Sequence, residues 1–315
     1  MKILVIFTGG TIGSVASDGW ISPNGQTKRE LISRYEKLNG NDVEFVSISP
    51  YTILSENLSA SEINLLVKSV LDNVNSGYDG IIVTHGTDTI HYSACALSYA
   101  LGSDCIPVML VSSNYPLSNP LANGHDNFSA SVEFIKQKGG RGVFVAYRNG
   151  NSPTKFHNAL SLICHREADD FLFSYNGYDY GELTNGKITL FDFALPVACG
   201  LGKFTLCANP NILVVNAYPG ESYDYTLDNR NAVILRPYHS GTLNTASDCF
   251  KHFCNRASEL NVPVFVVNAT FGETYASSKE FSALNLIPVY SSTFASVYMR
   301  LWIAISRGEN LYDIF

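Results

Sequence analysis

The chain has 315 residues, of which 46% are apolar and only 16% charged, and its formal net charge is -7. This length accommodates two compact domains, and the small share of charged residues favours an oligomer with buried interfaces. The negative charge, without any block of lysine and arginine, argues against binding to nucleic acid or to an anionic membrane. A small neutral or zwitterionic substrate fits this composition better.

The seven cysteines are scattered, and none forms a Cys-x-x-Cys pair. Their odd number argues against a disulfide framework, and their spacing argues against a zinc site. The apolar run over residues 3–7 is too short for the core of a signal peptide, and no later run is long enough to span a membrane. We therefore expect buried free thiols, no metal and a cytoplasmic protein.

Strand and helix patterns alternate from the start of the chain. A capping box at Ser59 and Glu62 predicts the start of a helix that ends at Gly77. Continuous apolar strands that alternate with helices indicate an α/β fold with a parallel sheet covered on both faces. Strands are expected over 3–7, 43–48, 80–84, 107–111 and 142–147, and further helices over 89–101 and around 132–135.

The alternation breaks from about Thr184 to Ala208, and a second alternating set follows. We expect a larger domain over 1–185, a connection over 186–209 and a smaller α/β domain over 210–315. In the smaller domain, strands are expected over 212–217, 232–236 and 263–268, and helices over 246–258 and 294–306.

The first strand runs into the turn Thr8-Gly9-Gly10-Thr11-Ile12-Gly13. Glycines allow the backbone to turn tightly and expose its N–H groups. A phosphate-binding loop is the alternative, but the turn lacks both the Lys-Ser/Thr ending of a P-loop and the GxGxxG spacing. Because ligands of open parallel sheets bind beyond the carboxyl ends of strands, this turn is a candidate site.

A second polar turn, Thr84-His85-Gly86-Thr87-Asp88-Thr89, follows the strand over 80–84. Thr87 or Asp88 could simply cap the next helix, which is the ordinary role of such residues. His85 suggests a Ser/His mechanism, but no serine partner is evident, so we expect it to fix the turn.

A hydroxyl nucleophile needs a base that accepts its proton. Thr11 supplies a hydroxyl in the first turn, and Thr87, Asp88 and Lys155 can form a hydroxyl–carboxylate–amine group opposite it. Alone, Lys155 would be a surface lysine and Ser55 a turn serine. Burial would favour the neutral form of the Lys155 amine, whereas Asp88 would favour its charged form. The sequence therefore does not decide which form of Lys155 is present.

The two turn motifs and the spacing between them resemble the signatures of the bacterial-type L-asparaginases, and the similarity to the cytoplasmic type I branch covers essentially the whole chain. The resemblance implies a larger N-terminal flavodoxin-like domain and a smaller C-terminal α/β domain. It implies an amidohydrolase that converts L-asparagine to L-aspartate and ammonia without cofactor or metal. It also implies a homodimer or homotetramer.

The resemblance assigns roles to individual residues. Thr11 would be the nucleophile that forms an acyl-enzyme, and Thr87, Lys155 and Asp88 would form the second catalytic group. Asp88, together with Ser55 and Glu56, would hold the amine and carboxylate of the substrate. Backbone N–H groups of the two turns, at Gly10 and Gly86, are candidates for the oxyanion.

Three positions depart from the family pattern. Many members carry a tyrosine in the loop after the first motif, whereas residues 14–26 contain none and Trp20 stands at the nearest position. An indole can donate a hydrogen bond but cannot accept a proton. Thr242 stands where an asparagine often reaches the neighbouring subunit's site, and Glu273 is a candidate acidic contact of that neighbour.

Three other functions remain open. A glutaminase substrate differs by one methylene, a difference worth only about 1–3 kcal/mol in a pocket. The amidase subunit of a tRNA-dependent amidotransferase has related motifs, but the chain shows neither an extra N-terminal domain nor a basic surface. A non-catalytic sensor of asparagine or aspartate would fit the missing tyrosine, while the complete set of catalytic residue types favours the enzyme.

Overall fold

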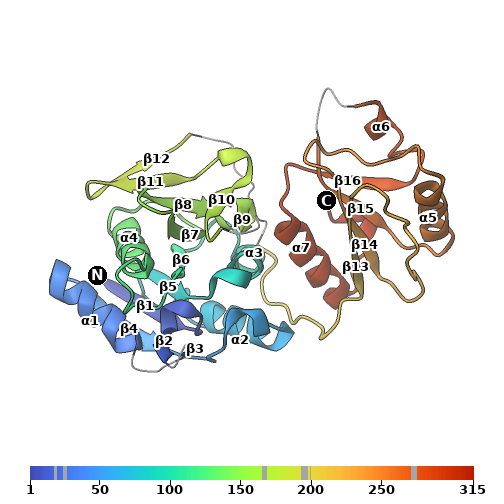
Figure 1. Cartoon of the computed structure of the whole chain (residues 1–315). Coiled ribbons are helices and arrows are strands. Elements are labelled where there is room, and N and C mark those ends of the chain that lie inside the picture. The colour runs from blue at the N-terminus through green and yellow to red at the C-terminus, as the bar shows by residue number, and fades with distance from the viewer. Residues whose placement is uncertain (18–19, 24–26, 165–168, 193–197, 199, 271–274) are drawn as a thin grey trace. The chain divides into compact units, whose positions relative to one another are not determined.

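The computed structural model describes residues 1–17, 20–23, 27–164, 169–192, 198, 200–270 and 275–315. The chain divides into two compact units, Met1–Phe204 and Thr205–Phe315 (Figure 1). Among the described residues, no helix combines the length and apolarity needed to cross a membrane.

An eight-stranded sheet forms the centre of the first unit, in the order β12-β11-β8-β7-β6-β5-β1-β4. Its five strands from β7 to β4 are parallel, whereas β8, β11 and β12 are antiparallel additions at one edge. The strands are β1 (Lys2–Phe7), β4 (Glu44–Ile48), β5 (Gly80–Thr84), β6 (Val108–Val111), β7 (Val143–Arg148), β8 (Thr154–Asn158), β11 (Gly181–Thr184) and β12 (Lys187–Leu190).

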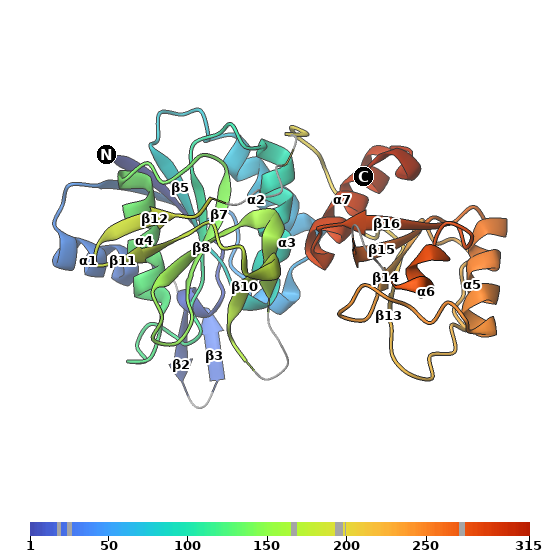
Figure 2. The ribbon, with the colours of Figure 1, turned by 90° about the horizontal axis from the view of Figure 1, so that it is seen from above.

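Two pairs of helices cover the two faces of this sheet (Figures 1 and 2). One face carries α1 (Thr27–Asn39) and α4 (Gly124–Lys136), and the other carries α2 (Ala60–Leu71) and α3 (Ile90–Leu101). All of β5 and most of β1 are buried, as expected for strands covered on both sides. The larger domain is thus confirmed as a predominantly parallel, covered sheet.

Local signals in the sequence explain several element boundaries. The capping box of Ser59 and Glu62 begins α2 as predicted, but the helix ends at Leu71, and turn residues fill the stretch before Gly77. Asn185 and Gly186 both have positive φ, so they form a two-residue hairpin turn between β11 and β12. Residues 187–190, expected in the connection, therefore extend the sheet, and the division between units falls after Phe204.

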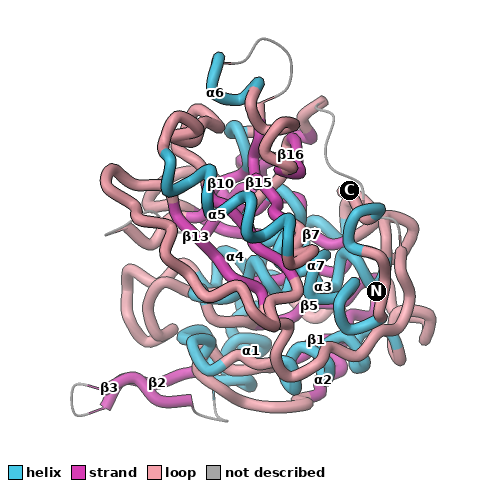
Figure 3. The backbone as a smooth tube through the Cα atoms, turned by 90° about the vertical axis from the view of Figure 1, so that its right-hand side faces the viewer, coloured by secondary structure: helices cyan, strands magenta, loops and turns pink. Residues whose placement is uncertain are grey.

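Smaller elements complete the first unit. Residues Ser14–Ser17 (β2) and Trp20–Pro23 (β3) pair as an antiparallel hairpin that stands away from the main sheet (Figures 2 and 3). A second short pair joins β9 (Leu162–Cys164) and β10 (Leu172–Ser174). Single 3-10 turns occur at Thr11–Gly13, Ser55–Asn57, Thr87–Thr89, Ala159–Ser161 and Tyr175–Gly177 in this unit.

The second unit is a four-stranded parallel sheet in the order β13-β14-β15-β16. Helix α5 (Asp248–Glu259) packs on one face and α7 (Phe294–Arg307) on the other. The sequence did not predict β16, because Pro288 interrupts its pattern; β16 is an edge strand, the place where proline is tolerated. The strands are β13 (Ile212–Asn216), β14 (Ala232–Arg236), β15 (Val264–Ala269) and β16 (Leu286–Tyr290), and α6 spans Ala276–Lys279.

Candidate active site

The first polar turn leaves β1 through two glycines with positive φ, 106° at Gly9 and 73° at Gly10. A Cβ on Gly9 would lie 2.2 Å from the carbonyl oxygen of Ile53, so no other residue fits there. The Gly10 N–H donates to that same carbonyl at 2.9 Å, and the Ile53 N–H donates to Thr8 O at 3.1 Å. The chain after β4 therefore holds the first turn in place.

The two polar turns touch through their glycines. A Cβ on Gly10 would lie 2.4 Å from the nitrogen and 2.5 Å from the Cα of Gly86. The Thr8 hydroxyl donates to Thr84 O at 2.6 Å, which ties the ends of β1 and β5 together. Since consecutive Cα atoms are about 3.8 Å apart, the Cα atoms of Thr11 and Thr87 lie at most about 12 Å apart.

Ser55 is the third partner at this junction. A Cβ on Gly86 would lie 2.3 Å from the Ser55 hydroxyl oxygen, so the serine packs directly against the second turn. The Ser55 hydroxyl donates to the Asp88 carboxylate at 3.2 Å, and the Thr89 hydroxyl donates to Ser55 O at 2.9 Å. Thus Asp88 and Thr89 bind the neighbouring segment rather than capping α3.

The side chains at this junction differ in their exposure to solvent. Ser55 is buried, Thr11 and Thr87 are partly buried, and Asp88 and Glu56 are exposed. Among the described residues, none forms a hydrogen bond with the Thr11 hydroxyl. The junction therefore presents partly buried threonine side chains and exposed carboxylates, and such carboxylates can bind a cationic group.

His85 has a structural role, as the sequence predicts. One ring nitrogen, Nδ1, lies 2.9 Å from Gly86 O, and Nε2 lies 2.8 Å from the Ser93 hydroxyl. The neutral ring therefore donates from Nδ1 and accepts at Nε2. Burial lowers the pKa of His85 to about 4, against the opposing effect of the Gly86 hydrogen bond. With both nitrogens occupied, His85 fixes the turn.

Lys155 lies on β8, a strand that the sequence analysis did not predict. The order of the sheet places β8 three strands from β5. Their axes are therefore about 14 Å apart. The amine of Lys155 lies 2.5 Å from Asp179 Oδ2. The structure thus joins Thr11, Ser55, Gly86, Thr87 and Asp88 at one junction, while the hydrogen bond of Lys155 is made elsewhere.

The remaining predicted residues lie outside this junction or outside the described residues. The backbone of Trp20 belongs to β3, but its side chain is outside the described part, as is all of Glu273. Thr242 belongs to the second unit, where its hydroxyl lies 3.0 Å from that of Ser240. Gly241, with φ of 73°, makes the turn in which both stand.

Sequence reasoning missed Ile53 and Asp179. An apolar residue that contributes only its backbone, like Ile53, leaves no signal in a single sequence. Asp179 follows Asn176-Gly177, a dipeptide that predicts a turn, and this signal could have drawn attention to the segment.

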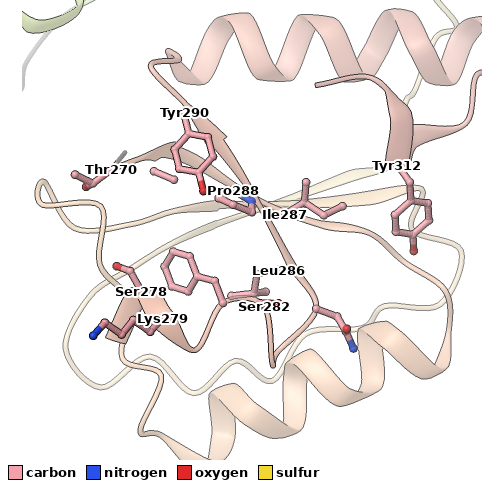
Figure 4. A pocket seen from close by; sticks show the side chains of 12 residues that line it. Thr270, Ser278, Lys279, Ser282, Leu286, Ile287, Pro288, Tyr290 and Tyr312 are labelled. Atoms are coloured by element: carbon pink, nitrogen blue, oxygen red, sulfur yellow. The ribbon is translucent and has the colours of Figure 1, made fainter. Parts of the chain in front are cut away.

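The second unit has a pocket of its own, with a volume of about 700 Å³. Ser278 and Lys279 lie at one end and Tyr312 at the other (Figure 4). Apolar side chains such as Leu286 and Pro288 line its middle. None of the predicted catalytic residues lines this pocket, so the candidate active site is the junction in the first unit.

Comparison with known proteins agrees with this geometry. Residues 2–161 match the family model described as "Asparaginase, N-terminal". The chain is 28% identical to the L-asparaginase of Thermococcus kodakarensis, over 100% of this chain and 95% of the relative. It is 26% identical to a subunit of the glutamyl-tRNA(Gln) amidotransferase of Methanosphaera stadtmanae, over 100% of this chain and 74% of the relative.

The solved structure of the thermostable L-asparaginase from Thermococcus kodakarensis has the same fold, with a TM-score of 0.80. The alignment covers 100% of this chain and 95% of that one, at 21% identity. The family model spans half of the chain and contains both polar turns. The chain therefore belongs to the asparaginase family of amidohydrolases.

Proposed function

We propose that the protein is an L-asparaginase that hydrolyses the side-chain amide of L-asparagine, releasing L-aspartate and ammonia. The observation that supports this most directly is the contact between Gly10 and Gly86. It brings the turn that carries Thr11 against the turn that carries Thr87 and Asp88. We place the substrate amide between these two turns.

The reaction proceeds in two displacements. The Thr11 oxygen attacks the amide carbon while a base takes its proton, and ammonia leaves with a proton returned to the nitrogen. Water then attacks the acyl-enzyme, restoring the Thr11 hydroxyl and releasing the acid. For the deacylating water, we assign the base role to the Thr87 hydroxyl, whose own proton passes to the Lys155 amine. General-base assistance of this kind contributes about two to four powers of ten.

Backbone N–H groups would stabilise the negative oxygen of the tetrahedral intermediate. The Gly10 N–H already donates to Ile53 O. Gly10, one of the two oxyanion donors expected from the sequence, is therefore excluded from that role. The N–H groups of Thr11 and Gly86 are the ones we assign to this role. One such donor is worth roughly 3–4 kcal/mol in comparable acyl transfers.

Substrate recognition falls to Ser55, Glu56 and Asp88. The carboxylates of Asp88 and Glu56 are exposed and match the ammonium group of a free amino acid. The Ser55 hydroxyl, which now donates to Asp88 at 3.2 Å, can turn to the substrate's α-carboxylate. This charge pattern favours a free amino acid over a peptide-bound amide.

The test is ammonia release from L-asparagine, L-glutamine and their D-forms, with Thr11→Ala as the matched inactive control. We expect L-asparagine to be the best substrate. Faster ammonia release from L-glutamine than from L-asparagine would show that the protein is a glutaminase instead. Binding of asparagine or aspartate without any release would show an amino-acid sensor instead.

The similarity to a subunit of a glutamyl-tRNA(Gln) amidotransferase supports a second candidate, an amidase that supplies ammonia to a partner protein. Co-purification with tRNA or a second protein, and release from glutamine that depends on that partner, would establish it. For the asparaginase we propose a homodimer or homotetramer in the cytoplasm, which analytical ultracentrifugation and cell fractionation would test. The free thiols of Cys95 and Cys254, both buried, suit a reducing compartment.

A further inference from the structure

Strand β8 presents two nitrogen-containing side chains on one face, because Lys155 and His157 are two residues apart. A single carboxylate binds both of them. Asp179 Oδ2 lies 2.5 Å from the Lys155 amine, and Oδ1 lies 3.2 Å from His157 Nδ1. The His157 nitrogen also lies 2.7 Å from the Ser174 hydroxyl.

Asp179 is the fixed member of this cluster. Its side chain is 8% exposed, against 37% for Lys155. Positive φ at Asn176 and Gly177 turns the chain back towards β8, and the Tyr180 N–H donates to Phe156 O at 2.7 Å. Burial raises the pKa of Asp179, but hydrogen bonds from His157 and Lys155 outweigh it and hold the pKa at about 2. The carboxylate is therefore charged and held in place, while the lysine is the more exposed partner.

Two other titratable groups face Lys155 across the sheet. The register pairs it with Tyr147 of β7 and with Glu182 of β11, and residues directly opposite share a face. The Tyr147 hydroxyl donates to Asp170 O at 2.8 Å, and Glu182 accepts from the Thr184 hydroxyl at 3.3 Å. Lys155 thus bonds to Asp179 although another carboxylate stands directly opposite it.

We propose that Asp179 is the positioning residue of Lys155: it anchors the amine at the start of β8 as an ammonium ion and controls when that amine is free to accept a proton. The kinetic part of this inference rests on the proposed function, in which the Lys155 amine takes the proton of the Thr87 hydroxyl. An ammonium ion has no lone pair for that proton. The amine must therefore leave the Asp179 carboxylate, which it now contacts at 2.5 Å, before it can accept that proton.

The pair can be probed directly, because Lys155 and Asp179 line a cavity of about 600 Å³ that also includes Ser174 and Asn176. We would measure the rate at which an amine-directed anhydride labels Lys155, read by mass spectrometry, across a range of pH. The variants are Asp179→Asn, Asp179→Glu and Glu182→Gln. Glu182→Gln is the matched control, because the Glu182 carboxylate lies opposite Lys155 in the sheet but is not bonded to its amine.

We expect Asp179→Asn to label Lys155 about tenfold faster at a given pH and to move the acid limb of kcat/KM to lower pH. Asp179→Glu keeps the charge and should restore slow labelling, while Glu182→Gln should leave both readouts unchanged. A purely structural role for Asp179 would lower the midpoint of thermal unfolding without moving the acid limb. Thermal unfolding of each variant separates the two roles.

Unchanged labelling of Lys155 in a folded Asp179→Asn protein would overturn the proposal that Asp179 anchors the Lys155 amine. Faster labelling of Lys155 without a change in the acid limb of kcat/KM would support the anchoring by Asp179. It would contradict the base role assigned to Lys155. If the unaltered protein releases no ammonia from any amide, the proposed function fails, and the labelling rates still decide the anchor.

Discussion

Gly10 and Gly86 pack backbone against backbone: a Cβ added to Gly10 would lie 2.4 Å from the amide nitrogen of Gly86. The two residues are 76 positions apart in the chain, yet each directly precedes a threonine of the proposed mechanism. Their lack of side chains allows the two turns to approach closely enough to face one small substrate.

Replacing either glycine by alanine should disrupt this junction. Gly10→Ala meets the Gly86 backbone and a positive φ, and Gly86→Ala meets Ser55, so we expect a loss of about 1–3 kcal/mol in the free energy of unfolding. Denaturant titration measures it. Gly13→Ala is the control, because a Cβ there meets nothing within 4 Å. Equal stability of the Gly10 and Gly13 variants would contradict the tight contact.

Removing the proposed nucleophile should stop the reaction without unfolding the protein. Thr11 is partly buried, and no described residue bonds its hydroxyl, so Thr11→Ala should keep its unfolding midpoint. Its kcat should fall by about 10⁴-fold or more, as in other enzymes that lose a nucleophile. Thr11→Ser keeps a hydroxyl and should retain measurable turnover. Turnover of Thr11→Ala near that of the unaltered protein would end the assignment.

The second catalytic group makes a separate prediction. Thr87→Val and Lys155→Met each remove the polar group while keeping a similar volume, and each should lower kcat for ammonia release by about two to four powers of ten. The double variant should be no slower than the worse single one, because groups that act as a unit are not additive. If the two losses multiplied, Thr87 and Lys155 would act independently.

Trp20 stands where many family members have a tyrosine. The indole cannot accept a proton, so Trp20→Tyr should be tolerated or should raise kcat, as measured by ammonia release. Trp20→Phe is the control that removes the polar group from either ring. A large loss of activity in Trp20→Tyr would show that the indole has a role of its own.

Acidification should destabilise the fold partly through His85. Burial lowers the pKa of His85 to about 4, below its ordinary value of 6.5, so the unfolded chain takes up its proton first as pH falls. The stabilisation is complete above pH 6.5 and is lost as pH falls towards 4. The loss is about 1.4 kcal/mol per pH unit, or about 2 kcal/mol between pH 6.5 and 5.

Denaturant titrations at pH 7 and 5 should therefore show a smaller decrease for His85→Gln than for the unaltered protein. A residual decrease in stability should remain in the His85→Gln variant, because burial also lowers the pKa of His125 to about 4. The exposed His252 provides the control, and His252→Gln should retain the full decrease. The same decrease in all three proteins would contradict a neutral, buried His85.

Several features could be predicted from the sequence because they depend on neighbours along the chain. The apolar runs of β1 and β5 show strands buried on both faces, and Ser59 with Glu62 marks the start of α2. The two polar turns were found from their composition and from their places at strand ends. Periodicity and capping are short-range effects, so one sequence records them well.

Other features were decided only when distant segments packed together. Ile53 supports the first turn through backbone groups that every residue type except proline possesses, and Asp179 reaches Lys155 from a turn 24 residues further along the chain. The tolerance of Pro288 in β16 depends on that strand's place at the edge of its sheet. Sequence by itself determined the elements with a clear local pattern and the chemical groups that they carry. The tertiary structure decided which groups meet, because hydrogen bonds and contacts between segments depend on the order of strands in the sheet and not on spacing along the chain.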